Sequence, residues 1–157
     1  VIKPITLETH INSGTDFFVG IGDNEIRKKF TEQLVKMNAS VVKLIDPTAI
    51  ISKFTMIDDG VIIMPGAIIN ADTHIGQGVI INTGAKIDHD CVIGKFSHVA
   101  PGVNIAGSVK LESMVFVGIG ANIINNVKIT KGVIVGANSL VLKDINKHGK
   151  YHGNPVK

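Results

Sequence analysis

The side chains that could do chemistry gather in one short stretch of the sequence. They are Asn82, Asp88, His89, Asp90 and His98. A histidine can act as a base near neutral pH, and an adjacent carboxylate orients the imidazole and favours its protonated form. We therefore predict that His89, assisted by Asp90, accepts a proton from an amine or hydroxyl as that group attacks a thioester.

Plainer interpretations of the same residues stay open. His89 could pair with its flanking carboxylates in a solvated corner, and His98 could be a surface histidine. His74 has no comparable neighbours in the sequence and is expected to be structural or exposed. Cys91 falls at a small, inward position of the repeat described next, so we expect it to be a packed core thiol.

A six-residue repeat must position these side chains. Every sixth residue from Ile45 to Val141 is Ile, Leu or Val, which gives 17 consecutive hexads, and the fifth residue of each hexad is Ala, Thr, Val, Cys or Ser until Ile145 closes the series. This pattern is typical of short strands joined by corners, three strands to a triangular coil of 18 residues. The prediction is a mainly β protein, a left-handed parallel β-helix of hexapeptide repeats over residues 45–145.

The coil length also predicts which residues are neighbours. Gly107 follows His89 by 18 residues, so it should lie one coil along, where a missing side chain would leave backbone N–H groups open to a developing oxyanion. His98 follows His89 by half a coil and should therefore lie on another face. The two histidines would meet only across a subunit interface, which predicts a homotrimer.

The residues before the repeat predict a small β-α-β piece. The segment FFVGIG at 17–22 reads as a buried strand, and residues 23–38 read as a capped helix with Ile26, Phe30, Leu34 and Met37 on one face. A second strand follows at 40–45. We assign residues 1–44 to a partial Rossmann-like, nucleotide-sugar-binding piece and residues 146–157 to a C-terminal tail.

Composition excludes several classes of partner. The net charge is only +3 and the basic residues are scattered, so neither a nucleic-acid surface nor a membrane surface is expected. The apolar stretches are too short to span a bilayer, and one cysteine excludes an intramolecular disulfide. These features favour a cytoplasmic protein.

Three segments together resemble one family of hexapeptide-repeat enzymes. FFVGIGDNEIRKKF, INTGAKIDHDCVIGKFSHVAPGVNIAGSVKL and the terminal GNPVK are similar to the sialic-acid O-acetyltransferase-like family, in particular to its UDP-4-amino-sugar N-acetyltransferases of the bacillosamine pathway. The resemblance implies an acetyl-CoA-dependent transferase without a metal that acetylates a UDP-amino sugar or another small sugar acceptor.

The resemblance also assigns roles to individual residues. It implies that His89 is the general base and Asp90, where the family usually has Glu, the residue that raises its basicity. It matches His98, Ile119 and Ala137 to acetyl-CoA contacts and Gly107 to a glycine beside the thioester. We expect Gly20, by the same resemblance, and Asn82 to contact the acceptor. The family's opening unit, with its glycine-histidine loop, is not found before residue 17, so we expect a truncated form.

Other functions remain to be separated from this one. O-acetylation of sialic acid or of another small hydroxyl acceptor would use the same helix. A zinc-dependent γ-carbonic anhydrase would use three histidines across a trimer interface, but His74, His89 and His98 lack the close H-x4-H pair of that family. A non-catalytic β-helix scaffold would bind no acetyl-CoA.

Overall fold

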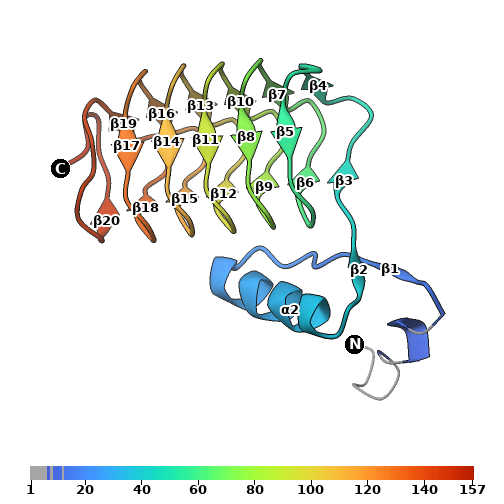
Figure 1. The fold of residues 1–157 in the computed structure, drawn as a ribbon. Helices are drawn as coiled ribbons and strands as arrows, with labels where there is room; N and C mark the ends of the chain where they lie inside the picture. The colour runs from blue at the N-terminus through green and yellow to red at the C-terminus, as the bar shows by residue number, and fades with distance from the viewer. Residues whose placement is uncertain (1–6, 8, 12) are drawn as a thin grey trace.

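The aliphatic residue of each hexad ends a two-residue strand. The computed structural model describes residue 7, residues 9–11 and residues 13–157, and in it the 17 hexads become 17 strands of a left-handed parallel β-helix (Figure 1). These strands are β3 (Leu44–Ile45), β4 (Ile50–Ile51), β5 (Met56–Ile57), β6 (Ile62–Ile63), β7 (Ile68–Ile69), β8 (His74–Ile75), β9 (Ile80–Ile81), β10 (Lys86–Ile87), β11 (Val92–Ile93), β12 (His98–Val99), β13 (Asn104–Ile105), β14 (Lys110–Leu111), β15 (Phe116–Val117), β16 (Asn122–Ile123), β17 (Lys128–Ile129), β18 (Ile134–Val135) and β19 (Leu140–Val141).

Strands three apart in the chain pair in parallel and form the three faces of the helix. One face is the sheet β4-β7-β10-β13-β16-β19, the second is β5-β8-β11-β14-β17, and the third is β3-β6-β9-β12-β15-β18 with a further strand, β20 (Lys150–Tyr151), at its end. The pairing holds the register that the repeat predicts, since Ile87 lies opposite Ile69 and Ile105. The predicted fold class is confirmed.

The interior of the helix is a column of aliphatic side chains. Ile81, Ile87 and Ile93 are each at most 1% exposed, and Cys91 is fully buried among them, as expected from its inward position. Burying one such side chain contributes about 1.5–3 kcal/mol, so the stacked column accounts for much of the driving force for folding. Chemistry is left to the outward strand positions and the corners.

Each corner turns at one residue with a positive φ angle. From Gly60 to Asn138 this residue recurs every six positions, and glycine or asparagine and aspartate occupy most of these places. The left-handed region is disfavoured for other residue types, because Cβ approaches the carbonyl oxygen. Asp90 occupies such a corner with φ 58°, so the turn itself fixes where its side chain leaves the backbone.

The N-terminal piece is a single β-α-β unit. Strands β1 (Asp16–Phe17) and β2 (Ser40–Val41) pair in parallel, and α2 (Asn24–Lys36) connects them. The predicted strand at 17–22 is therefore wrong in extent, since only its first residue lies in β1. Within the described residues this unit has a sheet of two strands, so a Rossmann-like domain is not confirmed.

The helix α2 forms where the sequence predicts it, but of its apolar face only Leu34 is buried. Asp23 caps it, with its side chain accepting a hydrogen bond from the Ile26 amide at 2.9 Å. The buried residues are Arg27, Thr31 and Leu34, whereas Ile26 and Phe30 are 47% and 44% exposed. The polar residues Arg27 and Thr31 are buried because the helix turns this side toward the corners of the β-helix.

The C-terminal residues continue the stacking of the coils. Ile145 bridges to Ile129, and β20 pairs in parallel with β18, so residues 146–157 lie against the last complete coil. In the part of the chain that the structure describes, no helix has the length and apolar character needed to cross a bilayer.

Candidate active site

His89 and Asp90 form a hydrogen-bonded pair at the corner after β10. Nδ1 of His89 lies 2.7 Å from Oδ2 of Asp90, and both side chains are 57% exposed. Because a carboxylate only accepts hydrogen bonds, Nδ1 carries the proton and the neutral ring keeps a lone pair on Nε2. The hydrogen bond to Asp90, and then the charge of Asp88, raise the pKa of His89 above its ordinary value. The pair has the form of an oriented general base.

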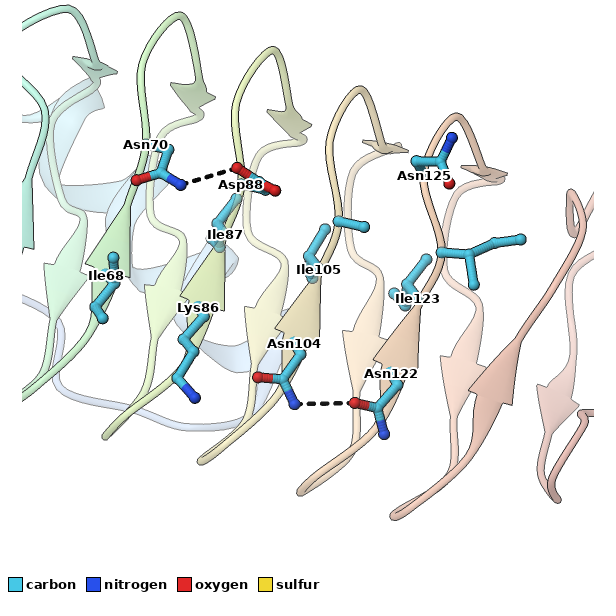
Figure 2. Close-up of a pocket in the computed structure, with 12 residues that line it drawn as sticks. Ile68, Asn70, Lys86, Ile87, Asp88, Asn104, Ile105, Asn122, Ile123 and Asn125 are labelled. Atoms are coloured by element: carbon cyan, nitrogen blue, oxygen red, sulfur yellow. Dashed lines mark hydrogen bonds between the residues drawn. The ribbon is translucent and has the colours of Figure 1, made fainter.

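Asp88 supports this corner and links it to the preceding coil. Its Oδ1 accepts a hydrogen bond from Nδ2 of Asn70 at 2.8 Å (Figure 2). The same oxygen accepts another from the backbone N–H of His89 at 2.9 Å. These two bonds, the one from Asn70 first, lower the pKa of Asp88, so its carboxylate stays charged beside His89. Asn70 was not singled out from the sequence, although it lies one coil of 18 residues before Asp88.

Gly107 lies directly against the His89 ring. A β carbon on this glycine would come within 2.8 Å of Cε1 and 2.9 Å of Nε2 of the imidazole, so a larger residue could not stand there without moving the ring. Among the third residues of the 17 hexads, Gly107 is the one glycine. Within the described chain its backbone N–H donates to no protein acceptor, while its carbonyl accepts from the Asn126 amide. The glycine that packs against the His89 ring thus keeps a free N–H.

A shallow cavity of about 530 Å³ extends from this corner along the face that contains β10 (Figure 2). Asp88 lines it beside isoleucine and asparagine side chains from successive coils, and Nδ2 of Asn104 donates to Oδ1 of Asn122 at 2.9 Å. The remaining lining residues are Ile68, Asn70, Lys86, Ile87, Ile105, Ala106, Ile123, Ile124 and Asn125. Amide groups alternating with apolar side chains suit a long ligand that has both kinds of group.

His98 belongs to a second set of residues on another face. Its Nδ1 lies 3.2 Å from the carbonyl oxygen of Gly22, its Nε2 lies 3.2 Å from Nδ2 of Asn82, and its ring meets the edge of Phe116 with centroids 5.1 Å apart. Burial lowers the pKa of His98 below its ordinary value. His98 is therefore neutral near pH 7 and is a hydrogen-bonding group rather than a proton carrier.

A second cavity, of about 500 Å³, opens beside His98. It is bounded by the first turn of α2 and by outward residues of the seven-stranded face. Its lining residues are Gly22, Asp23, Asn24, Glu25, His98, Met114, Phe116, Gly132, Ile134 and His148. Neither Asn24 nor His148 was singled out from the sequence, because their approach to His98 depends on how the N- and C-terminal segments pack on the helix.

The structure divides the polar stretch of the sequence into these two sets. Asp88, His89 and Asp90 lie at a corner of the six-stranded face, whereas Asn82 and His98 belong to the seven-stranded face. The cause is the coil length, since nine residues are half of an 18-residue turn. Within one chain the two histidines serve different surfaces.

The other predicted contact residues lie on the outer surface. Ile119 and Ala137 occupy equivalent corners of successive coils, and Ile119 is 59% exposed. A β carbon at Gly118 would lie 2.7 Å from the Ala137 amide nitrogen, so these coils pack closely. Gly20 is exposed in the segment before α2. Among the residues that the structure describes, no three His, Cys, Asp or Glu side chains are grouped so that they could hold a metal ion.

Comparison with known proteins identifies the family of this chain. Residues 72–107, which include His89, Asp90, His98 and Gly107, match the family model described as bacterial transferase hexapeptide (six repeats). A crystal structure of a histidine-to-alanine mutant of GDP-perosamine N-acetyltransferase from Caulobacter crescentus, in complex with CoA and GDP-perosamine, is 36% identical with a TM-score of 0.95. The match covers 99% of this chain and 74% of that one. The chain belongs to the hexapeptide-repeat acetyltransferases.

Further solved structures match over most of the chain. The acetyltransferase domain of PglB from Neisseria gonorrhoeae, in complex with acetyl coenzyme A, is 31% identical with a TM-score of 0.91, covering 96% of this chain and 75% of that one. WeeI from Acinetobacter baumannii is 26% identical with a TM-score of 0.87, covering 90% and 69%. Among curated proteins, none matches this hexapeptide-repeat acetyltransferase significantly. The family resemblance found in the sequence is confirmed.

Proposed function

We propose that this acetyltransferase moves the acetyl group of acetyl-CoA to the amine of a nucleotide-linked amino sugar, with His89 as the general base. The observation that carries the proposal is the 2.7 Å hydrogen bond between His89 and Asp90, formed directly beside Gly107. The acceptor class is supported by the relatives, one of which is a GDP-perosamine N-acetyltransferase in complex with CoA and its nucleotide sugar. A UDP-linked 4-amino sugar is the other candidate acceptor.

In the proposed reaction the acceptor nitrogen attacks the thioester carbonyl carbon while its proton moves to Nε2 of His89. The C–N bond forms and the carbonyl oxygen becomes an oxyanion, which the free N–H of Gly107 is placed to stabilise. The C–S bond then breaks, and the CoA sulfur leaves with the proton that His89 accepted. Asp90 keeps Nδ1 protonated and stabilises the imidazolium that forms in between.

We propose that a complete site needs more than one subunit. His89 and His98 lie on different faces of one β-helix, so a ligand that contacts both has to lie between two copies. A three-sided helix repeated around a threefold axis would present these faces to each other, which gives a homotrimer with three sites. Sedimentation analysis tests this idea, because an active monomer at assay concentration would contradict it.

His98, Ile119 and Ala137 are proposed to contact acetyl-CoA, and Gly20 and Asn82 the acceptor. The cavity that Asp88 lines next to the His89 corner has alternating amide and apolar groups, which suit a pantetheine-like ligand. We place the reaction in the cytoplasm, because Cys91, the one cysteine, is a free thiol and a cytoplasmic redox environment keeps thiols reduced.

The test is a panel of acceptors assayed by CoA release. GDP- and UDP-linked 4-amino sugars are compared with the matched sugars that have a hydroxyl at the same carbon, and with sialic acid. The proposal expects acetyl-CoA turnover with an amino sugar nucleotide, and the product to be an amide. Turnover with the hydroxyl sugars alone would show an O-acetyltransferase instead and would contradict the proposal.

A further inference from the structure

Arg27 of α2 is a buried cation whose hydrogen-bond partners are neutral oxygens. Arg27 is 1% exposed, and all three nitrogens of its guanidinium group donate hydrogen bonds to protein oxygens. Nε donates to the carbonyl of Gly78 at 2.7 Å, and Nη2 donates to Oδ1 of Asn24 at 2.7 Å and to the carbonyl of Phe96 at 2.9 Å. Such a complete set of donors and acceptors is needed to keep a charge in the interior.

The same guanidinium also holds the segment that precedes the helix. Nη1 donates to the carbonyls of Ile21 and Gly22, at 2.9 Å and 3.0 Å. Arg27 thus joins two parts of the chain more than 50 residues apart, with corners of the β-helix on one side and the 21–22 backbone on the other. The planar fork of arginine can serve both sides at once, which a single ammonium nitrogen cannot.

The carbonyl of Gly22 links Arg27 to His98. This oxygen accepts from Arg27 Nη1 at 3.0 Å and also lies 3.2 Å from Nδ1 of His98. A carbonyl can only accept, so Nδ1 of His98 carries the proton. Nε2 of His98 then accepts from Nδ2 of Asn82 at 3.2 Å, and Asn82 is oriented in turn because its Oδ1 accepts from the Thr83 amide at 2.8 Å.

We propose that Arg27 is a positioning residue of the acetyltransferase, which fixes the Gly22 carbonyl and through it holds His98 as the neutral Nδ1–H tautomer. Both ring nitrogens of His98 are then engaged, Nδ1 by the Gly22 carbonyl and Nε2 by Asn82, so the ring is fixed where it lines the second cavity. In this role His98 presents a fixed, neutral ring to a bound ligand and does not carry a proton. The consequence for acetyl transfer rests on the proposed function, but the tautomer does not.

The charges around His98 support a neutral ring. Burial and, to a smaller extent, the positive charge of Arg27 lower the pKa of His98, while the bond to Gly22 opposes them. The other titratable groups that line the cavity are Asp23 and Glu25, from the start of α2, and His148 from the C-terminal segment.

Nitrogen-15 NMR of protein with labelled histidines reads the tautomer directly. His98 is assigned by the signals lost in His98→Gln. In the unmodified protein we expect a protonated Nδ1 and an unprotonated Nε2 at neutral pH, with titration below the range of an ordinary histidine. An Nε2–H tautomer or a charged ring at pH 7 would overturn the proposal without any change at Arg27.

Variants of α2 then test whether Arg27 sets the tautomer of His98. Arg27→Met should give His98 a mixture of tautomers and a higher pKa, whereas Lys29→Met, the matched loss of an exposed cation on the same helix, should change neither. Arg27→Lys keeps the charge but not the fork, so it should also show the mixture. If the two Arg27 variants are folded and keep the single tautomer, Arg27 does not position His98.

Steady-state kinetics separates positioning from general damage. In Arg27→Lys we expect the KM for acetyl-CoA to rise by about tenfold or more, because a misplaced binding group weakens the aligned complex. The pH at which kcat rises should stay the same, since His89 sets it. An unchanged KM for acetyl-CoA would show that Arg27 does not affect cofactor binding through His98. If the NMR result holds but no acetyl transfer is seen, the proposed function has failed and the positioning role has not.

Discussion

The imidazole of His89 rests on the backbone of Gly107, one coil further along the helix. A β carbon at this glycine would lie 2.8 Å from Cε1 of the ring, well inside van der Waals contact. The glycine is required by this close approach rather than by its own backbone, since its φ angle is outside the left-handed region. The position of the base therefore depends on a residue that has no side chain.

Gly107→Ala should consequently impair catalysis with little effect on folding. The added methyl displaces the ring from its place beside the Gly107 N–H, and a shift of about 1 Å can cost about 10²-fold in rate. We expect kcat to fall by about that factor while the melting temperature changes by only a few degrees. Full activity in a folded Gly107→Ala protein would show that the contact does not matter.

Asp90→Asn should change the pH dependence of the reaction. The hydrogen bond to Asp90 is the largest cause of the raised pKa of His89, so its loss lowers that pKa. In the proposed mechanism the neutral imidazole is the base, so kcat/KM rises as pH rises through this pKa, and the rising limb should move to lower pH in the variant. Asparagine tolerates the positive φ of this corner, so the backbone should be kept.

The pH-rate profile of kcat/KM checks this prediction, with Asp58→Asn as the matched control. Asp58 also accepts a hydrogen bond from a histidine, His74, at 3.0 Å, but the pair involves the five-stranded face. We expect the control to keep the profile of the unmodified protein. An unchanged profile in Asp90→Asn would show that Asp90 does not set the pKa of the catalytic base.

Cys91 should be unreactive in the folded protein. Burial raises the pKa of its thiol to about 11, and its sulfur lies 3.2 Å from the carbonyl oxygen of Ala106 within the coil interior. The thiolate is the reactive form, so a thiol reagent at pH 8 should modify the native chain very slowly. In denaturant the same reagent should modify one thiol per chain. Rapid native labelling would mean that the coils open at this corner.

Binding of acetyl-CoA should stabilise the protein, and His98 should contribute to the effect. A ligand that binds the native state at about 100 times its Kd adds about 2.7 kcal/mol to stability. We expect acetyl-CoA to raise the melting temperature, and His98→Ala to reduce the rise more than His74→Ala does. Equal shifts in the two variants would exclude His98 from the cofactor site.

The repeat allowed most of the fold to be predicted from the sequence, because in a β-helix the residues that stack on each other are a fixed number of positions apart. A side chain every six residues and a coil of 18 determine which residues stack, so the neighbourhood of His89 and Gly107 followed from numbering alone. The same rule would have found Asn70 beside Asp88. The helix of residues 24–36 was also predicted, since its cap and its length are local features.

The packing of that helix could not be predicted in the same way. Helical periodicity identifies the apolar stripe as the buried one, but α2 packs against backbone carbonyls at the corners of the coils, and these acceptors select Arg27. The positions of these backbone carbonyls cannot be inferred from the types of the residues that carry them. For the same reason the contact of His98 with Gly22, which are 76 residues apart, was not foreseen.

The most direct test of the account is the rate of acetyl transfer in His89→Ala. With acetyl-CoA and an accepted amino sugar nucleotide, CoA release is measured between pH 6 and pH 9, and His74→Ala serves as the control histidine. Removal of a general base typically costs about 10²- to 10⁴-fold. We predict a loss of kcat in this range for His89→Ala at every pH, with little change in acetyl-CoA affinity and with normal turnover in the control. Full turnover of folded His89→Ala across this pH range would contradict the account.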